Sequence, residues 1–435
     1  MSKTAALMLV LVFLTASCVI VPLPVKAGSK TLVVPDDYAT IGEAVRAAAE
    51  GDLIFVKNGT YNEQTLTINK TLSLKGESIE DTVITFHPPL YFVGWQGVTP
   101  MYTYNEALTI YANDVEISGF TISAELTTEA PADLSEHTLG QCDPPFSATG
   151  GAHVLSTGNN TKITGNTIQT GLLIEGSNQT IAENTLTGHV TCKGSSNKVF
   201  SNLITGLSIL VEGFANEIHA NNISGVYNGI QVIGEAHVIA GNNITNCKYG
   251  MSVYYTTLGV VGSNNVFYGN RLTQNVNGIV VTGGNNNTFF GNELIDNTVG
   301  VTVETSMRYQ DLPKPNATFY HNNFVGSVQQ VNLSTSSAGF FDYGGEGNYW
   351  NDYTGLDSNV DGIGDTPYVI DDNRRDNYPL MLPFDIENNS IVIPSNTPSV
   401  PNFNLLAASI AALVGVIVVV TCLLVYYKKR KSLDN

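Results

Sequence analysis

The stretch "NEIHANNISGVYNGIQVIGEAHVIAGNNITNCKYG", residues 216–250, holds two copies of one short pattern. In each copy an isoleucine lies three residues before an asparagine, Asn221 or Asn242, and a second isoleucine lies two residues after it. The pattern recurs along the chain, and both flanking positions are apolar in all eight copies. The asparagines are Asn166, Asn184, Asn202, Asn221, Asn242, Asn270, Asn292 and Asn322.

The spacing of this pattern decides the fold class. Successive asparagines are 18 to 30 residues apart, and the short polar and apolar alternation around them is typical of strands. The repeat is too short for a four-stranded propeller blade and lacks the helical half of most leucine-rich repeats. It fits one coil of a parallel β-helix, in which coils stack about 4.8 Å apart and aligned asparagines form a ladder of amide hydrogen bonds. We therefore predict an all-β fold, a single-stranded parallel β-helix solenoid.

Residues in excess of the repeat must leave the coil as loops. We predict such excursions at residues 88–152, 250–262 and 305–317, within a repeat region of residues 88–342. Insertions in solenoids tend to lie on one face, often the binding face. Aromatic residues in these loops could stack on sugar rings, or they could pack locally over the solenoid wall. The glycan-binding candidates are Tyr91, Phe92, Trp95, Tyr102, Tyr104, Tyr254 and Tyr255.

The ends of a solenoid expose strand edges and need covers. In the N-terminal segment, residues 28–87, Thr40 and Glu43 fit a capping box, apolar residues follow at helical spacing, and Gly51 ends the predicted helix. We expect this helix to cap the first coils. Residues 343–384 form the predicted C-terminal cap.

Both termini of the chain suggest passage through a membrane. Residues 1–27 combine Lys3, an apolar run and small residues, as in a secretory signal peptide, with an uncleaved anchor as the alternative. A Pro/Ser/Asn-rich linker, residues 385–404, precedes 23 uncharged residues, 405–427, which are long enough to span a bilayer. A basic tail, residues 428–435, follows at once and is predicted to be cytoplasmic. We expect a single-pass cell-membrane protein with its ectodomain outside.

Charge and cysteine content exclude two broad classes. The formal net charge is −18, and a field of that sign repels nucleic acid and anionic lipid. We therefore expect no nucleic-acid partner. Outside the terminal segments the cysteines are Cys142, Cys192 and Cys247, which allow one disulfide at most, so the chain is no disulfide scaffold.

Two longer segments resemble a known family. "ATIGEAVRAAAEGDLIFVKNGTYNEQTLTINKTLSLKG", residues 39–76, resembles the opening of pectin-lyase-like right-handed β-helix proteins, especially the NosD branch. "GNYWNDYTGLDSNVDGIGDTPYVIDDNRRDNYPLM", residues 347–381, is similar to the C-terminal signature of NosD-like, CASH-type surface proteins. The resemblance implies a right-handed solenoid and an archaeal surface protein. It also implies two kinds of function, because NosD proteins act in copper delivery to nitrous oxide reductase and the wider group comprises carbohydrate-binding proteins and sugar hydrolases.

The residues themselves do not support copper. A copper site needs clustered His, Met or Cys, whereas no two of the seven histidines are closer than sixteen residues. His189 and Cys247 share a position in the repeat, but they lie three coils apart, about 14 Å at the strand spacing.

The sequence of the coils also shows no clear pattern of catalytic residues. Glycoside hydrolysis needs two carboxylates facing one bond, and a lyase would need Lys or Arg beside acidic residues. The acids of the central coils are scattered: Glu175, Glu183, Glu212, Glu217, Glu235, Glu293 and Asp296. The expected function is a membrane-anchored, non-catalytic protein that binds glycans, polysaccharide or surface-layer components of the cell envelope. A polysaccharide-active lyase, epimerase or hydrolase remains the alternative, and a NosD-type accessory role in copper delivery rests on the resemblance alone.

The loop "GLDSNVDGIGD", residues 355–365, is the predicted metal site. Its alternating oxygen ligands match positions 1, 3, 5, 7 and 9 of an EF-hand-like calcium loop, and Gly362 matches position 6. Position 12 is Tyr368 instead of Glu, and an Asx-rich turn without an ion is the alternative. We expect a structural calcium ion. The ligands would be Asp357, Asn359, Asp361, the Ile363 carbonyl and Asp365.

Two glycosylation sequons follow ladder asparagines directly. Asn222 and Asn243 should point outward and are the predicted glycosylation sites.

Overall fold

The computed structural model describes residues 28–96, 99–104, 106–125, 147–148, 153–254, 262–305, 314–334 and 338–386. The predicted signal peptide, the linker beyond residue 386, the membrane span and the cytoplasmic tail lie outside these residues. Among the helices that are described, none has the length and apolar character needed to cross a membrane. The predicted parallel β-helix is confirmed, with three long parallel sheets, here called A, B and C. The chain divides into two compact units, residues 1–194 with 198–207, and residues 195–197 with 208–435.

Unit 1 repeats the order A, B, C from coil to coil. Sheet A contains β1 (Thr31–Val34), β2 (Asp52–Val56), β5 (Leu72–Gly76), β10 (Glu116–Ser118), β14 (Lys162–Thr164), β17 (Thr180–Ala182) and β20 (Lys198–Phe200). Sheet B contains β3 (Gly59–Glu63), β6 (Thr82–Phe86), β11 (Thr121–Ala124), β15 (Thr167–Ile168), β18 (Thr185–Leu186) and β21 (Leu203–Ile204). Sheet C contains β4 (Leu66–Ile68), β9 (Leu108–Ile110), β13 (His153–Ser156), β16 (Gly171–Ile174) and β19 (Val190–Cys192).

Unit 2 follows the same order. Sheet A contains β23 (Glu217–His219), β26 (Val238–Ala240), β29 (Val266–Tyr268), β32 (Asn287–Phe290), β35 (Asn316–Tyr320) and β38 (Ala338–Phe340). Sheet B contains β24 (Asn222–Ser224), β27 (Asn243–Thr245), β30 (Arg271–Thr273), β33 (Glu293–Ile295), β36 (Asn323–Val325) and β39 (Tyr349–Trp350). Sheet C contains β22 (Ile209–Val211), β25 (Asn228–Val232), β28 (Tyr249–Val253), β31 (Asn277–Val281), β34 (Val299–Val303) and β37 (Gln329–Leu333).

The predicted asparagine ladder is confirmed in both units. In unit 1, the backbone N and the Nδ2 of Asn166 both donate to Asn184 Oδ1, at 2.9 and 3.2 Å. In unit 2, every ladder residue from Asn221 to Asn322 donates in the same direction, and Asn348 continues the series. These side chains are buried, and each such hydrogen bond contributes about 1 kcal/mol net.

Two further ladders were not predicted. One, in unit 2, links Asn197, Asn216, His237, Asn265 and Asn287 through backbone N–H groups that donate to the next side chain. The other links Cys247, Asn275 and Asn297. Three rows of buried polar side chains therefore align the coils of unit 2 at their corners.

Apolar side chains fill the interior. In unit 2 the rings of Phe267, Phe289, Phe319 and Phe341 stack with centroids 4.3, 4.9 and 5.1 Å apart. Phe267, Phe289 and Phe319 each stand three residues before a ladder asparagine, where the repeat predicts an apolar residue. Phe341 continues the stack from a position seven residues before Asn348. The sequence column therefore becomes a continuous aromatic stack in the core.

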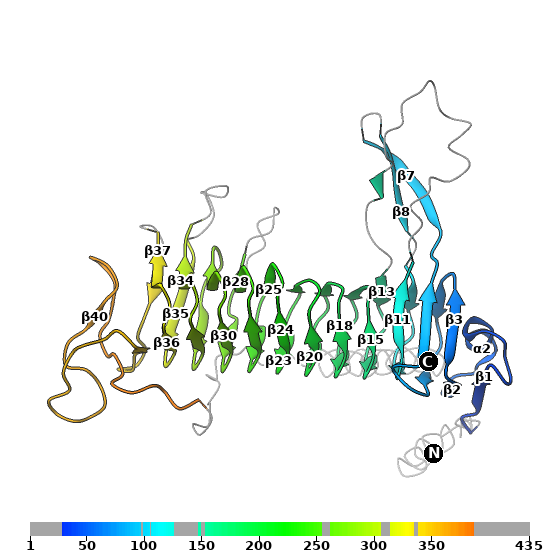
Figure 1. Cartoon of the computed structure of the whole chain (residues 1–435), viewed down its shortest axis with the longest axis horizontal. Helices are drawn as coiled ribbons and strands as arrows, with labels where there is room; N and C mark the ends of the chain where they lie inside the picture. Colours follow the sequence, from blue (N-terminus) through cyan, green and yellow to red (C-terminus); the bar gives the residue numbers. More distant parts are fainter. Residues whose placement is uncertain are drawn as a thin grey trace, which may run out of the picture. The chain divides into compact units, whose positions relative to one another are not determined.

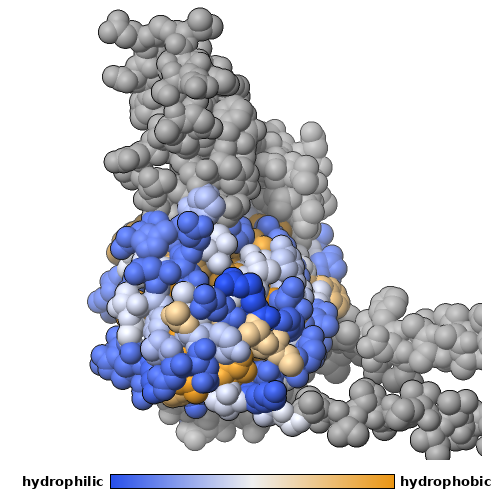
Figure 2. Space-filling view, turned by 90° about the vertical axis from the view of Figure 1, so that its right-hand side faces the viewer, coloured by the Kyte–Doolittle hydropathy of each residue, from blue (hydrophilic) through white to orange (hydrophobic). Residues whose placement is uncertain are grey.

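The predicted N-terminal helix is confirmed as α2 (Ile41–Ala47). The Thr40 hydroxyl accepts a hydrogen bond from Glu43 N at 3.1 Å, which is the N-cap interaction. Ile41, Ala44 and Val45 are buried, so the helix turns its apolar face to the first coils. Figure 2 views the molecule from this side and shows a largely hydrophilic surface with small hydrophobic areas.

The predicted excursion at residues 88–152 is not one loop. It contains a complete coil formed by β9, β10 and β11, which pairs with coils on both sides. The repeat did not reveal this coil because Phe120 stands at its ladder position, where Phe120 N donates to Asn166 Oδ1. The excursion is therefore divided into a segment before β9 and a segment after β11.

The excursions leave the coils at two different corners. In unit 1 they follow sheet B and precede sheet C, whereas in unit 2 residues 255–261 and 306–313 follow sheet C and precede sheet A. Both of these corners border sheet C. The unit 1 excursion contains β7 (Leu90–Gln96), β8 (Thr99–Tyr104) and β12 (Ser147–Ala148), which form a separate sheet. In Figure 1, β7 and β8 stand away from the neighbouring coils of their unit.

The segment after β39 closes the C-terminal end of unit 2. Trp350 is buried and stacks on Phe324 at 4.1 Å and on Tyr368 at 4.2 Å. A short antiparallel pair, β40 (Tyr368–Val369) and β41 (Arg375–Asp376), follows.

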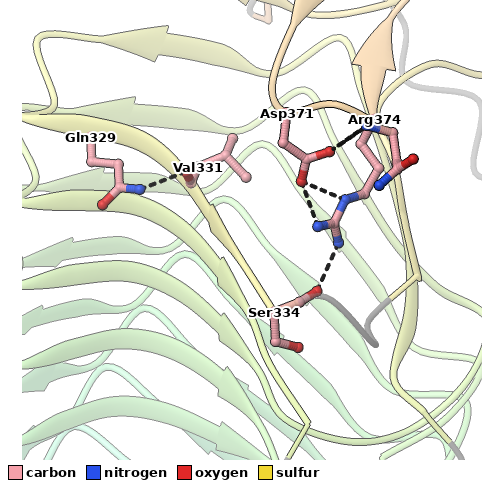
Figure 3. Close-up of polar contacts among 6 residues, drawn as sticks. Gln329, Val331, Ser334, Asp371 and Arg374 are labelled. Carbon is pink, nitrogen blue, oxygen red and sulfur yellow. Dashed lines mark hydrogen bonds and ion pairs between the residues drawn. The ribbon is translucent and has the colours of Figure 1, made fainter.

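A hydrogen bond from Arg374 ties this segment to the end of the last strand of sheet C. Arg374 pairs with Asp371 at 2.5 Å and donates to Ser334 O at 3.0 Å, next to β37. Figure 3 shows this link beside Gln329, whose Nε2 donates to Val331 O on the same strand. The contacts fasten the C-terminal segment where the coils end.

Candidate carbohydrate-binding site

The antiparallel hairpin β7–β8 carries most of the predicted glycan-binding residues. Its register pairs Leu90 with Tyr104, Phe92 with Tyr102 and Trp95 with Pro100. Paired residues share a face of the hairpin, and so do residues two apart on one strand. A β-bulge between Phe92 and Gly94 takes up one residue, so that Trp95 returns to the face of Phe92.

The register therefore brings four of the five aromatic candidates of this excursion to one face. They are Phe92, Trp95, Tyr102 and Tyr104. Tyr91 pairs with Thr103 and belongs to the opposite face. We call the first set the aromatic face. The strand β12 adds to β8, with Ser147 opposite Met101, and it widens the sheet on that side.

A cluster of titratable residues that the sequence did not predict lies where the hairpin rejoins the coils. Glu106 follows β8 by two residues, and its Oε2 accepts a hydrogen bond from His153 N at 3.0 Å. The same oxygen lies 3.4 Å from His153 Nδ1. His189 packs edge-on against His153, with ring centroids 4.8 Å apart. We call Glu106, His153 and His189 the imidazole cluster.

The two imidazoles can meet only because Gly171 lies between them. His153, Gly171 and His189 occupy the same position in three successive coils. A Cβ at Gly171 would lie 2.3 Å from His153 Cδ2 and 2.7 Å from His189 Cε1, so any other residue would force the rings apart. The signal was present in the sequence, because the three residues are 18 apart, like Asn166, Asn184 and Asn202.

The electrostatics of the cluster favour a neutral His189. Burial lowers the pKa of this imidazole, and the charge of His153 lowers it further. The Glu106 carboxylate faces Nδ1 of His153 at 3.4 Å. The cluster therefore offers hydrogen-bond donors and acceptors suited to sugar hydroxyls, and a group able to transfer a proton.

The predicted calcium loop is held by its own backbone. Asp357 accepts from Asp361 N at 3.2 Å and from Gly362 N at 2.9 Å. Asn359 Nδ2 donates a hydrogen bond to the Asp361 carboxylate, and Asn359 Oδ1 accepts one from Asp361 N. The Asp361 carboxylate also accepts a hydrogen bond from Ile363 N at 2.9 Å. The side-chain oxygens of Asp357, Asn359 and Asp361 thus already accept hydrogen bonds from backbone amides of the loop.

The far end of this loop is fastened in the same way. Asp365 accepts from Ser358 N at 2.8 Å, and its hydrogen bonds with Ser358 lower the pKa of its carboxyl group. Over the part of the chain that the structure describes, no group of three or more His, Cys, Asp or Glu residues is arranged to hold a metal ion. The calcium site stays a prediction.

Comparison with known proteins agrees with the fold. The family described as "Right handed beta helix region" matches residues 205–341. A segment of 52 residues is 48% identical to the probable ABC transporter binding protein NosD of Stutzerimonas stutzeri and 44% identical to that of Pseudomonas aeruginosa. The chain thus contains a right-handed β-helix region and a short segment similar to NosD. Each match spans only 12% of this chain and 12% of the relative, and the predicted archaeal origin stays a prediction.

A solved structure shows the same architecture. The family 28 exopolygalacturonase of Yersinia enterocolitica superposes with a TM-score of 0.54 at 10% identity, over 72% of this chain and 79% of that enzyme. At that identity the likeness concerns the fold alone. The β-helix fold is thus shared with a polysaccharide-active enzyme.

The remaining predicted sites lie on unit 2. Tyr254 is half-buried at the end of β28, and burial is the main cause of its raised pKa. Tyr255 lies outside the described residues. Asn222 and Asn243 occupy adjacent strands, are exposed as predicted, and Asn243 Nδ2 donates to Asn222 Oδ1 at 3.3 Å. Their glycosylation stays a prediction.

Cys192 and Cys247 are buried and do not form a disulfide with each other. Cys142 lies outside the residues that the structure describes.

Proposed function

We propose that this protein binds glycans through the aromatic face of the β7–β8 hairpin. One observation carries the proposal: the register assembles Phe92, Trp95, Tyr102 and Tyr104, which are scattered over 13 residues of sequence, on a single face. Aromatic side chains offer large apolar faces with a polar tip in Tyr and Trp, and sugar rings present apolar C–H faces that pack on such surfaces.

The imidazole cluster supports the same location. It lies directly beyond the hairpin, since Glu106 is two residues from Tyr104 and His153 opens the first strand after the excursion. Hydrogen-bonding groups beside an apolar surface are the usual composition of a ligand site. A saccharide on the aromatic face would find its hydroxyl partners there.

The cellular setting completes the proposal. Residues 405–427 carry no charge and are followed by a basic tail, which supports a protein anchored in the cell membrane with the β-helix outside. A non-catalytic role at the cell envelope, on polysaccharide or surface-layer components, fits this setting.

The imidazole cluster also favours a second candidate, a polysaccharide-active enzyme. A carboxylate that faces Nδ1 of His153 and a second imidazole within ring contact provide a general acid–base arrangement. In that case the aromatic face would bind the substrate and His153 would transfer a proton.

A glycan array with the purified full chain, read for binding and for product release, tests both candidates. We expect Trp95→Ala to weaken binding of the selected glycan at least tenfold, about the value of one lost aromatic contact. Tyr91→Ala on the opposite face is the matched control and should bind as the wild type does. Absence of any bound glycan, or equal losses in the two variants, would contradict the proposal.

The same array separates binding from catalysis. If the protein is an enzyme, His153→Gln abolishes product release while binding persists. Binding without any product from the wild type refutes the enzymatic candidate.

A further inference from the structure

A second group of aromatic side chains surrounds a lysine on unit 2. Lys248 Nζ donates a hydrogen bond to Tyr227 Oη at 2.6 Å. The ammonium lies 4.5 Å from the ring centroid of Tyr227 and 5.0 Å from that of Tyr249. The two rings meet edge-on at 5.6 Å. We call these three residues the tyrosine–lysine cluster.

Among the residues that the structure describes, no carboxylate neutralises the charge of Lys248. Lys57, Lys162 and Lys193 form ion pairs with Asp36, Glu116 and Glu175. Around Lys248, by contrast, no carboxylate of the described residues lies within ion-pair distance, and its partners are two phenol rings. In a chain with a net charge of −18, this leaves a local positive field that an external anion can use.

The hydrogen bond to Tyr227 keeps the lysine charged. It is the main cause of the raised pKa of Lys248 and of the lowered pKa of Tyr227. Tyr227 is 60% exposed, so its ring remains open to a ligand beside the ammonium. The cluster thus combines a cation, a hydroxyl group and an aromatic surface at one exposed place.

The surface continues along the coils of unit 2. Tyr227, Lys248, Val276, Thr298 and Val328 occupy the same position in five successive coils, as backbone hydrogen bonds between neighbouring coils show. Val276 is 49% exposed and Val328 87% exposed. Beyond the cluster the row therefore presents an uncharged surface, along which a chain-like ligand could extend.

We propose that the tyrosine–lysine cluster binds an anionic sugar residue, a ring that bears a carboxylate or a sulfate group. The ammonium of Lys248 and the hydroxyl of Tyr227 would hold the anionic group, and the open face of Tyr227 would pack on the ring. Neighbouring uncharged sugars would lie over Val276 and the residues that follow it. This site shares no residue with the aromatic face of the hairpin.

Calorimetric titration of the full chain tests this site with three probes. They are a tetrameric uronate oligosaccharide, its methyl ester and a sulfated galactan oligosaccharide. The uronate and its ester differ only in charge, and the sulfated probe distinguishes the two kinds of anionic group. We expect at least one of the charged probes to bind and the methyl ester to bind at least tenfold more weakly, because a hydrogen bond to a charged group is about twice as strong as a neutral one.

Substitutions locate the binding. Lys248→Met keeps the aliphatic stem and should reduce the affinity for the charged probe at least tenfold. Tyr227→Phe keeps the ring and should reduce it less. Lys193→Met is the matched control, because it removes an exposed lysine that a glutamate already neutralises. Unchanged melting temperatures show that the variants are folded.

The outcomes separate this inference from the proposed function. If charged probes bind but respond to Trp95→Ala and not to Lys248→Met, the hairpin binds them and this inference is wrong. Equal affinity for the acid and its methyl ester, or no binding of any charged probe, also overturns it. Loss of charged-probe binding in Lys248→Met alone supports it, whatever the hairpin variants show.

Discussion

Asp52 in unit 1 and Asp376 in unit 2 both accept hydrogen bonds at an end of the coils, with opposite electrostatic results. Asp52 accepts from Lys30 N and Ala49 N, both at 2.8 Å, and these bonds lower the pKa of its carboxyl group. Asp376 accepts from Asn348 N at 2.7 Å and from Trp350 Nε1 at 2.9 Å. Yet burial raises the pKa of Asp376 to about 6.

The difference teaches that the number of hydrogen bonds does not decide the charge state. Asp376 also accepts from Asn348 Nδ2 and from Tyr378 N, so four donors face its two oxygens. All four hydrogen bonds favour the ionised form. The bonds from Asn348 and Trp350 are buried, whereas the two bonds that Asp52 accepts are only partly buried. Removal from water outweighs the donors at Asp376.

The largest effect is expected from Asp376→Ala. This change leaves the buried N–H groups of Asn348 and Trp350 without an acceptor, and we expect a loss of about 4 kcal/mol in the free energy of unfolding. Asp52→Ala, with partly exposed partners, should lose only about 1 to 2 kcal/mol. Urea unfolding of both variants measures the difference. Equal losses would show that burial does not distinguish the two carboxylates.

Asp376→Asn breaks the electrostatic half of the comparison. Because the pKa of Asp376 is about 6 when folded and 3.8 in the reference state, the folded state holds more protons between those pH values. This residue's contribution to stability therefore falls as pH rises from about 4 to 6, by about 3 kcal/mol. Asparagine has no such titration, so the variant should lack this decline in unfolding experiments from pH 4 to 7. An unchanged pH profile would refute the buried-charge account.

His237→Asn sharpens the comparison, because His237 and Asp376 change the stability in opposite directions as the pH rises, and this variant removes the contribution of His237. Its Nδ1 accepts from Asn216 N at 3.1 Å, and burial lowers its pKa from 6.5 to about 4. The unfolded state takes up the proton first, so the stability due to a neutral His237 is lost as pH falls from about 6.5 to 4, by about 3 kcal/mol. Asparagine fits the ladder and should remove this acid sensitivity. The same pH series, run on His237→Asn, checks the sign, and a profile identical to the wild type would contradict it.

The smallest effect on stability is expected from a change at Glu63. Its carboxylate accepts hydrogen bonds from Ile41 N and Gly42 N, at the start of α2, at 2.9 and 3.2 Å. Glu63→Gln keeps an acceptor oxygen and removes a negative charge near a helix N-terminus, so we expect a loss of about 0.5 to 1 kcal/mol. High salt should reduce the difference from the wild type. A loss as large as that of Asp376→Ala would mean that α2 depends on the charge itself.

The fold could be predicted because one residue type repeats at one position. Asn221 and Asn242 recur with the same apolar neighbours, and stacking converts that period into a ladder. The second ladder contains His237 among its asparagines, so no single residue type repeats along it and the sequence pattern does not show it. The coil with Phe120 at its ladder position was not predicted for the same reason, because it lacks the asparagine.

The candidate sites were harder to predict, because they depend on contacts that a period does not record. The register of the hairpin, with its bulge after Phe92, decides which aromatic residues share a face. Glu106 and His153 meet although 46 residues, including the coil formed by β9, β10 and β11, lie between them in the sequence. Asp376 occurs once, in a segment that belongs to no repeat, and only its position beside Asn348 gives it a role.

The direction of the asparagine ladder has an evolutionary consequence. Each internal ladder residue, such as Asn270, accepts from the coil before it and donates to the coil after it. A duplicated or deleted coil therefore leaves no unpaired amide behind, provided that the terminal acceptor Asp376 is kept. Recombination between repeats can therefore lengthen or shorten this solenoid, and with it the proposed ligand-binding surfaces, without the need to evolve a new end.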